Sequence, residues 1–93
     1  MRIPKRVKIG GHWFDIIYSN DDKGFRDSGF KGSWRNIIVL NKELKQSKRE
    51  SVLLHEIIHE ISWQNDLELK EVEVSTIAEG LYQVLIDNKL LKG

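Results

Sequence analysis

The hydrophobic pattern of this chain changes period near its middle, and that change restricts the folds open to it. In the first half, apolar residues form short runs rich in β-branched and aromatic side chains, as in VKIGGHWFDIIYS and RNIIVLN. In the second half, they recur every three or four residues through two long segments. Short runs of this kind are typical of strands, and the longer spacing is typical of amphipathic helices. We therefore expect an α+β fold, with a small antiparallel sheet of two to four strands followed by two helices.

Glycines mark the expected turns in the strand half. Gly10 and Gly11 interrupt the first apolar run and indicate a turn or a bulge. The segment GFRDSGFKGSW is rich in glycine and serine, so we expect an irregular segment or a short hairpin there. Residues 37–40 are all apolar and predict a buried strand. A chain of 93 residues has material for one modest core, so residues 1–93 should form a single domain.

Two helices are expected in the second half. The first should begin near Lys48, because Ser47 and Glu50 match the S-x-x-E capping box. At about 100° per residue, one arc of this helix is apolar and should pack against the sheet: Leu53, Leu54, Ile57, Ile58 and Ile61. The polar segment QNDLELK should end it. The second helix should run from about Lys70 to Asn88, with an apolar face made of Val74, Ile77, Ala78, Leu81, Val84 and Leu85.

The charge balance and the absence of cysteine narrow the classes of partner and metal site. Because 15 Lys and Arg nearly cancel 14 Asp and Glu, the net charge is +1, and we expect neither a nucleic-acid nor a membrane partner. Without cysteine, disulfides and thiolate metal ligands are excluded. No apolar run approaches the roughly 20 residues of a membrane span, and the start of the chain lacks the apolar region of a signal peptide. A cytoplasmic location is therefore expected, while the oligomeric state stays open.

The segment HEIIHE, residues 55–60, has the H-E-x-x-H spacing of a metal-binding helix. His55 and His59 lie one helical turn apart on the same side, so both imidazoles can face one ion. Neutral imidazole is a good ligand for Zn²⁺, and we expect one zinc ion per chain. Glu56, on the same flank, can take a proton from a metal-bound water and is our candidate general base.

The third protein ligand of a catalytic zinc should be a carboxylate from the second helix. Three protein ligands and an open position are typical of such sites, and no histidine follows the motif. Helical geometry places Glu71 on the flank of the apolar face, in line with Ala78, whereas Glu73 lies at the opposite margin. Glu68 lies at or before the start of the helix. We favour Glu71, with Glu73 and then Glu68 as alternatives.

The two helical segments together resemble the small gluzincin-type zinc metallopeptidases, or minigluzincins, which are found in phage and mobile-element proteins and are related to ImmA/IrrE-type peptidases. Their pattern is H-E-x-x-H on one helix and E-x-x-A-x-x-F-A on the next. In this chain, LLHEIIHEI is followed by ELKEVEVSTIAEGLYQVL, with Glu71, Val74, Ile77 and Ala78 in the matching places. The runs IGGHWFDIIYS and NIIVLN are similar to the antiparallel sheet that precedes the family's active-site helix.

The resemblance implies that Glu71 is the third zinc ligand and that the substrate is a peptide or protein. Four positions after this glutamate, the family often has an acidic or amide residue that supports a ligating histidine. This chain has Ser75 there. A serine would orient the imidazole less strongly than a carboxylate, which weakens the expectation of strong catalysis more than that of metal binding.

Several other polar and aromatic residues have a structural interpretation that we favour over a functional one. His12 is a candidate proton donor to a reaction intermediate, but a histidine on a strand face is the plainer interpretation. Tyr82 is a candidate electrophile, or else a tyrosine at the core edge with its hydroxyl in water. Trp34 and Trp63 are candidates to line a substrate groove, although core positions are expected. Glu60 should face solvent.

Three hypotheses on function follow from these residues. The first is a zinc-dependent metallopeptidase in which Glu56 is the general base for hydrolysis of peptide bonds. The second is a zinc-stabilised protein-interaction module with little or no proteolytic activity, because a domain this small has little material for a substrate groove. The third is a zinc-free structural domain whose histidines form hydrogen bonds within the core.

Overall fold

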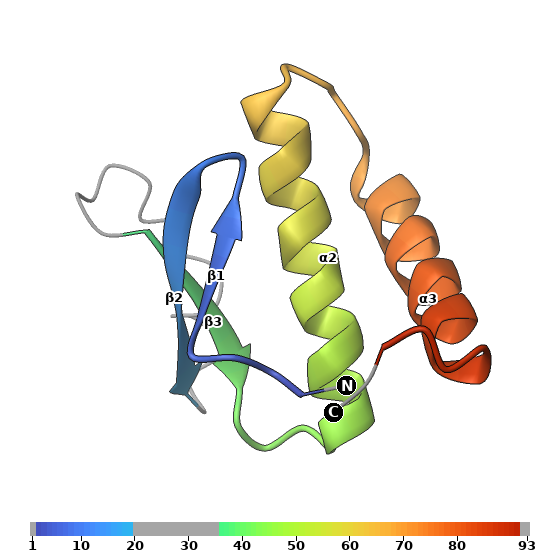
Figure 1. The fold of residues 1–93 in the computed structure, drawn as a ribbon. Helices are drawn as coiled ribbons and strands as arrows, with labels where there is room; N and C mark the ends of the chain where they lie inside the picture. Colours follow the sequence, from blue (N-terminus) through green and yellow to red (C-terminus); the bar gives the residue numbers. More distant parts are fainter. Residues whose placement is uncertain (1, 20–35, 92–93) are drawn as a thin grey trace.

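In the computed structural model, which describes residues 2–19 and 36–91, three strands precede two helices (Figure 1). The strands are β1 (Arg6–Ile9), β2 (His12–Ser19) and β3 (Ile37–Asn41). The helices are α2 (Gln46–Gln64) and α3 (Glu71–Asp87). The α+β class, the number of strands and the order of strands before helices are confirmed. The glycine-rich segment GFRDSGFKGSW lies outside the described residues.

The sheet is mixed, in the order β1-β2-β3, and this corrects the expectation of an antiparallel sheet. Strands β1 and β2 pair antiparallel, whereas β2 and β3 pair parallel, with Asp15 opposite Ile37 and Ser19 opposite Asn41. Parallel neighbours require a crossover of about a dozen residues or more, and the stretch 20–36 is long enough to provide one. The direction of β3 therefore could not be inferred from the apolar pattern of the strand itself.

A tight turn joins β1 to β2 at the two glycines. Gly10 and Gly11 have φ angles of 59° and 88°, a left-handed region that other residues rarely adopt. Gly10 also faces Gln64, because a Cβ atom added to it would lie 1.7 Å from Oε1 of that side chain. The amide of Gln64 donates a 3.0 Å hydrogen bond to the carbonyl of Ile9. The turn is thus fastened to the C-terminal end of α2.

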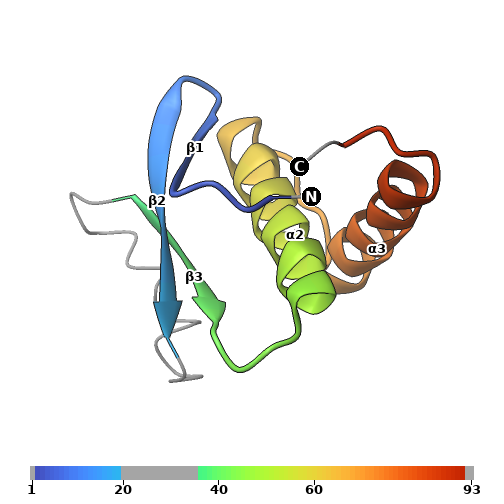
Figure 2. The ribbon, with the colours of Figure 1, turned by 60° about the horizontal axis from the view of Figure 1, so that its bottom comes forward.

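Helix α2 lies between the sheet and α3 (Figure 2). The core between the sheet and α2 contains Leu53 at 1% exposure, with Val52 and Ile57 packed against it. From the sheet it contains Ile9, Phe14, Ile16, Ile38 and Leu40. Ile61, which was expected in the same arc, is 44% exposed because the packed arc of α2 is narrower than its apolar arc.

Helix α3 runs within one residue of the predicted bounds, but it buries only part of its apolar face. Val74 and Ala78 are buried, whereas Ile77, Leu81 and Val84 are 47%, 42% and 43% exposed. The reason is that α3 packs on α2 alone among the described elements, and one neighbouring helix covers only a narrow stripe. Neither helix in the described part of the chain is long and apolar enough to cross a membrane.

The predicted capping box at the start of α2 is wrong. The helix begins at Gln46, so Ser47 lies inside the first turn, and the N-cap residue Lys45 makes no side-chain cap hydrogen bond. Glu50 is instead buried, and its carboxylate accepts hydrogen bonds from the Gln46 amide at 2.8 Å and the Tyr82 hydroxyl at 2.5 Å. Glu50 was expected to accept a hydrogen bond at the start of α2. It instead links α2 to α3 through Tyr82.

Candidate metal centre

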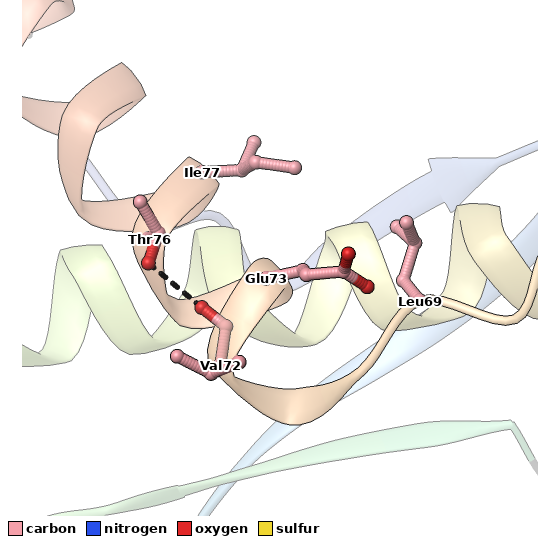
Figure 3. A pocket seen from close by; sticks show the side chains of 5 residues that line it. All are labelled: Leu69, Val72, Glu73, Thr76 and Ile77. Atoms are coloured by element: carbon pink, nitrogen blue, oxygen red, sulfur yellow. Dashed lines mark hydrogen bonds between the residues drawn. The ribbon is translucent and has the colours of Figure 1, made fainter.

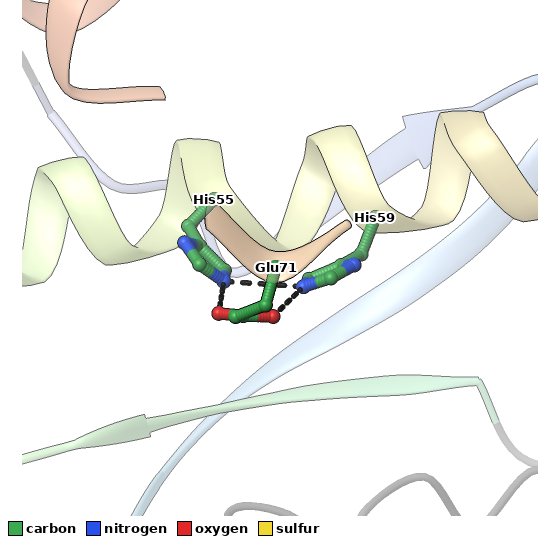
Figure 4. Close-up of side chains that lie close together, drawn as sticks. All are labelled: His55, His59 and Glu71. Carbon is green, nitrogen blue, oxygen red and sulfur yellow. Dashed lines mark hydrogen bonds and ion pairs between the residues drawn. The ribbon is translucent and has the colours of Figure 1, made fainter. Parts of the chain in front are cut away.

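Three potential ligands converge between α2 and α3. His55 and His59 lie one turn apart on α2, and Glu71 is the first residue of α3. The connection through residues 65–70 brings the start of α3 back beside α2, so that the Glu71 carboxylate lies next to both imidazole rings (Figure 4). One possible ligand atom from each of the three residues lies within 4.8 Å of the other two. The convergence of a helical pair and a residue from the next helix is the arrangement expected from the sequence.

Both imidazoles present the same nitrogen to the carboxylate. Nε2 of His55 lies 2.7 Å from Oε2 of Glu71, and Nε2 of His59 lies 2.8 Å from Oε1. The two Nε2 atoms are 3.1 Å apart (Figure 4). Each carboxylate oxygen thus faces a different ring, and the two rings meet edge to face with centroids 4.8 Å apart and planes at 65°.

Hydrogen bonds do not account for all three contacts of this triangle while the carboxylate is ionised. If both Nε2 atoms carry protons, each donates to one carboxylate oxygen, and two donor nitrogens then lie side by side at 3.1 Å. If one Nε2 carries none, its lone pair faces a carboxylate oxygen across 2.7 or 2.8 Å. Either arrangement leaves one close contact between groups of like polarity. A cation among the three residues would attract all of these atoms at once.

The spacing suits zinc after a small expansion. Nitrogen and oxygen ligands bound at about 2.0–2.1 Å in a tetrahedron lie roughly 3.3 Å from one another. The contacts of 2.7, 2.8 and 3.1 Å are shorter than this by about 0.2 to 0.6 Å. The histidine side chains are 19% and 17% exposed, whereas Glu71 is 69% exposed. Water can therefore reach the ligand group from the Glu71 side, as an open fourth position requires.

The alternatives to Glu71 lie elsewhere. The carboxylate of Glu73 accepts a 2.6 Å hydrogen bond from the backbone N–H of Lys70 and so serves the start of α3. Glu73 also lines a pocket of about 440 Å³ together with Leu69, Val72, Thr76 and Ile77 (Figure 3). Glu68 is exposed in the connection before α3. Neither glutamate belongs to the converging group of the described residues.

Each histidine of the group has a neighbour that contacts its ring. The Ser75 hydroxyl lies 3.5 Å from Nδ1 of His55, a long contact that orients the ring only weakly. Trp63 stacks on His59 with ring centroids 5.4 Å apart and an angle of 19° between the planes. Trp63 is 52% exposed, so the expectation of a core position is wrong for this residue. The spacing of four residues between His59 and Trp63 on one helix is a signal from which this contact was predictable.

The candidate general base lies beside this group. Glu56 follows His55 directly on α2, and its side chain is half-buried. At about 100° per residue, it lies on the flank of the histidine pair that faces away from α3. Glu56 is not part of the converging group, so it lies next to the potential ligands and is not one of them.

The candidates His12 and Tyr82 lie outside the group, as does Glu60. His12 is exposed at the start of β2. The Tyr82 hydroxyl donates to Glu50, so it is not directed at the histidines. Glu60 accepts a 3.1 Å hydrogen bond from the Gln64 amide. Trp34 lies outside the described residues.

Comparisons with known proteins add no relative to these observations. No protein-family model matches the chain, no curated protein resembles it significantly, and no solved structure does so either.

Proposed function

We propose that this protein is a zinc-dependent metallopeptidase, with His55, His59 and Glu71 as the zinc ligands. The observation that carries the proposal is the convergence of two Nε2 atoms from one helix and one carboxylate from the next within 2.7–3.1 Å. The pattern shared with minigluzincins supports the same ligand set and a peptide or protein as substrate. The phage origin and the cytoplasmic location suggested by the sequence remain predictions.

In the proposed reaction, His55, His59 and Glu71 would bind the zinc, and Glu56 would transfer the proton. When bound, zinc would supply a Lewis acid that polarises the peptide carbonyl and makes a water molecule more acidic. The carboxylate of Glu56 accepts one proton from the attacking water as the new C–O bond forms. The same carboxyl group then passes that proton to the amide nitrogen as the C–N bond breaks, so that a free acid and a free amine leave.

A second candidate function is a zinc-stabilised module that binds another protein and cleaves nothing. Two observations favour it. The Ser75 hydroxyl supports His55 across a long 3.5 Å contact, where a carboxylate would bind the ring more strongly. The apolar side chains of Ile77, Leu81 and Val84 are more than two fifths exposed on α3, and apolar surface of this kind can serve a protein partner.

Replacement of Glu56 by Gln separates the two functions. The variant should keep one zinc per chain and the wild-type thermal stability, and lose cleavage of a peptide library by a factor of about 10² or more. Glu60→Gln is the matched control, because it changes the same side chain on the same helix and should leave cleavage intact. If the zinc-loaded wild type cleaves no peptide in the library, the binding module is the correct function.

The zinc content distinguishes both proposed functions from the third hypothesis, a structural domain that binds no metal. Elemental analysis should find about one zinc per chain in protein purified without a histidine tag. A content near zero that does not rise after addition of zinc would refute the metal centre altogether.

A further inference from the structure

We infer that Trp63 forms one wall of a substrate subsite beside the metal centre, and that this subsite takes a bulky apolar side chain of the peptide, an aromatic one above all. The inference rests on the proposed function and names a feature of its substrate. It is carried by the position of Trp63 relative to His59 and Glu56 and by the exposure of the indole.

The indole lies directly against a ligand. Trp63 follows His59 by one helical turn, and the two rings stack at 5.4 Å with nearly parallel planes. The edge of the His59 ring that bears Nε2 points to Glu71, so the stacked face is separate from the edge that would hold the ion. The aromatic wall therefore adjoins the metal centre without occupying a ligand position.

Trp63 and the proposed general base share a flank of α2. They are seven residues apart, so they differ by only about 20° around the helix axis. Glu56 must lie near the water that attacks the peptide carbonyl, so the reacting carbonyl must lie along this flank. The indole lies two turns, about 10 Å, further along the helix axis. A substrate side chain one or two residues from the reacting carbonyl can therefore reach it.

Trp63 offers an exposed aromatic surface beside the histidine pair. About half of this residue, 52%, is accessible to solvent, and a large aromatic ring beside polar groups is a common element of ligand-binding sites. Trp13 is exposed to a similar degree, 48%, but it lies on β2 and not on α2. The cationic groups of Arg6 and Lys8 lie over its ring at 4.6 and 5.6 Å. Trp13 neighbours Phe14, which is buried towards α2, so Trp13 points to the opposite face of the sheet.

The test compares two zinc-binding probes that differ in one side chain. N-acetyl-phenylalanine hydroxamate and N-acetyl-glycine hydroxamate both offer a chelating group, and only the first offers an aromatic ring. Calorimetric titration of the zinc-loaded protein should show that the phenylalanine probe binds tighter by about tenfold or more. In Trp63→Ala this preference, measured as the ratio of the two affinities, should fall to about twofold or less. Trp13→Ala is the matched control and should keep the preference.

A second measurement needs no variant. In ¹H–¹⁵N spectra of the zinc-loaded wild type, the indole N–H signal of Trp63 should shift with the phenylalanine probe and not with the glycine probe, and the Trp13 signal should not shift with either. A preference that survives in Trp63→Ala, or a Trp63 signal that ignores the phenylalanine probe, would overturn the subsite alone. Failure of the wild type to bind zinc or the glycine probe would overturn the metal centre, and the subsite with it.

Discussion

The hydroxyl of Tyr82 on α3 donates a 2.5 Å hydrogen bond to the buried carboxylate of Glu50 on α2. This bond joins the two helices near the start of α2, whereas the histidine and Glu71 contacts join them nearer its end. The helix pair is thus linked at two places along its length. The placement of Glu71 against the histidines depends on how α3 lies on α2, so the Tyr82 bond helps to keep these three residues together.

The Tyr82 bond predicts a loss of stability in alkali. Burial, and then the hydrogen bond and charge of Glu50, raise the pKa of Tyr82 from 10.0 to about 12. The pKa of Tyr82 is higher in the folded than in the unfolded protein. The stabilisation that the protonated hydroxyl gives the fold is therefore complete below pH 10 and is lost as the pH rises through about 12. Urea unfolding of the wild type between pH 8 and 12 should show this decline.

Tyr82→Phe should remove that part of the decline. The variant should also be less stable at pH 7 by about 1.5–3 kcal/mol, because the buried Glu50 carboxylate loses a donor. Tyr18→Phe is the control, since Tyr18 is 42% exposed on β2, and it should keep the alkaline decline. An unchanged decline in Tyr82→Phe would show that another group causes it.

Removal of any one proposed ligand should weaken zinc binding severely. His55→Ala, His59→Ala and Glu71→Ala should each lower the zinc affinity by more than about 100-fold, measured by competition with a chromophoric chelator. Glu73→Gln should keep the wild-type affinity, because Glu73 bonds the backbone of Lys70 and takes no part in the converging group. If Glu73→Gln loses as much zinc affinity as Glu71→Ala, the assignment of Glu71 as the only carboxylate ligand is wrong.

Zinc should stabilise the fold, because its ligands come from two helices that it would hold together. At a free zinc concentration 100 times the dissociation constant, the stabilisation is about 2.7 kcal/mol. For a domain of this size, this corresponds to a rise in the unfolding midpoint of about 10–20 °C over the chelator-treated protein. Thermal scans with zinc and with chelator measure the shift, and in His59→Ala the two scans should coincide.

Gly10 is predicted to be costly to replace for two separable reasons. Gly10→Ala places a side chain at a φ of 59° and forces Gln64 to withdraw from its hydrogen bond to Ile9. We expect a loss of about 2–3 kcal/mol in urea unfolding. Gly11→Ala meets only the backbone strain, because nothing lies within 4 Å, and should lose about 1–2 kcal/mol.

A double-mutant cycle isolates the contact with Gln64. In a Gln64→Ala background, Gly10→Ala should cost about as much as Gly11→Ala does in the wild type, since only the backbone strain remains. If Gly10→Ala costs the same with and without Gln64, the close approach of the two residues has no energetic consequence.

The sequence alone determined the features that depend on neighbours along the chain. The helical period predicted α3 within one residue of Glu71–Asp87, and the start of α2 within two residues of Gln46. The spacing of His55 and His59 predicted two imidazoles on one side of a helix, because a helical turn has the same geometry wherever it occurs. The glycine pair likewise predicted the turn between β1 and β2, because few other residues adopt positive φ.

Contacts between distant segments were decided only by the tertiary structure. The parallel pairing of β2 with β3 depends on the path of the chain between them, which the apolar pattern of a strand does not encode. Glu50 matched a local capping pattern but lies buried against Tyr82, because the packing of α3 on α2 offered it a stronger partner. The choice of Glu71 over Glu73 agreed with helical periodicity, yet the 2.7 and 2.8 Å contacts with the histidines arise from the connection that returns α3 to α2. The spacing of residues along the chain specifies which side chains share a face of a helix or strand. The residues that this face contacts are specified only by the packing of the elements.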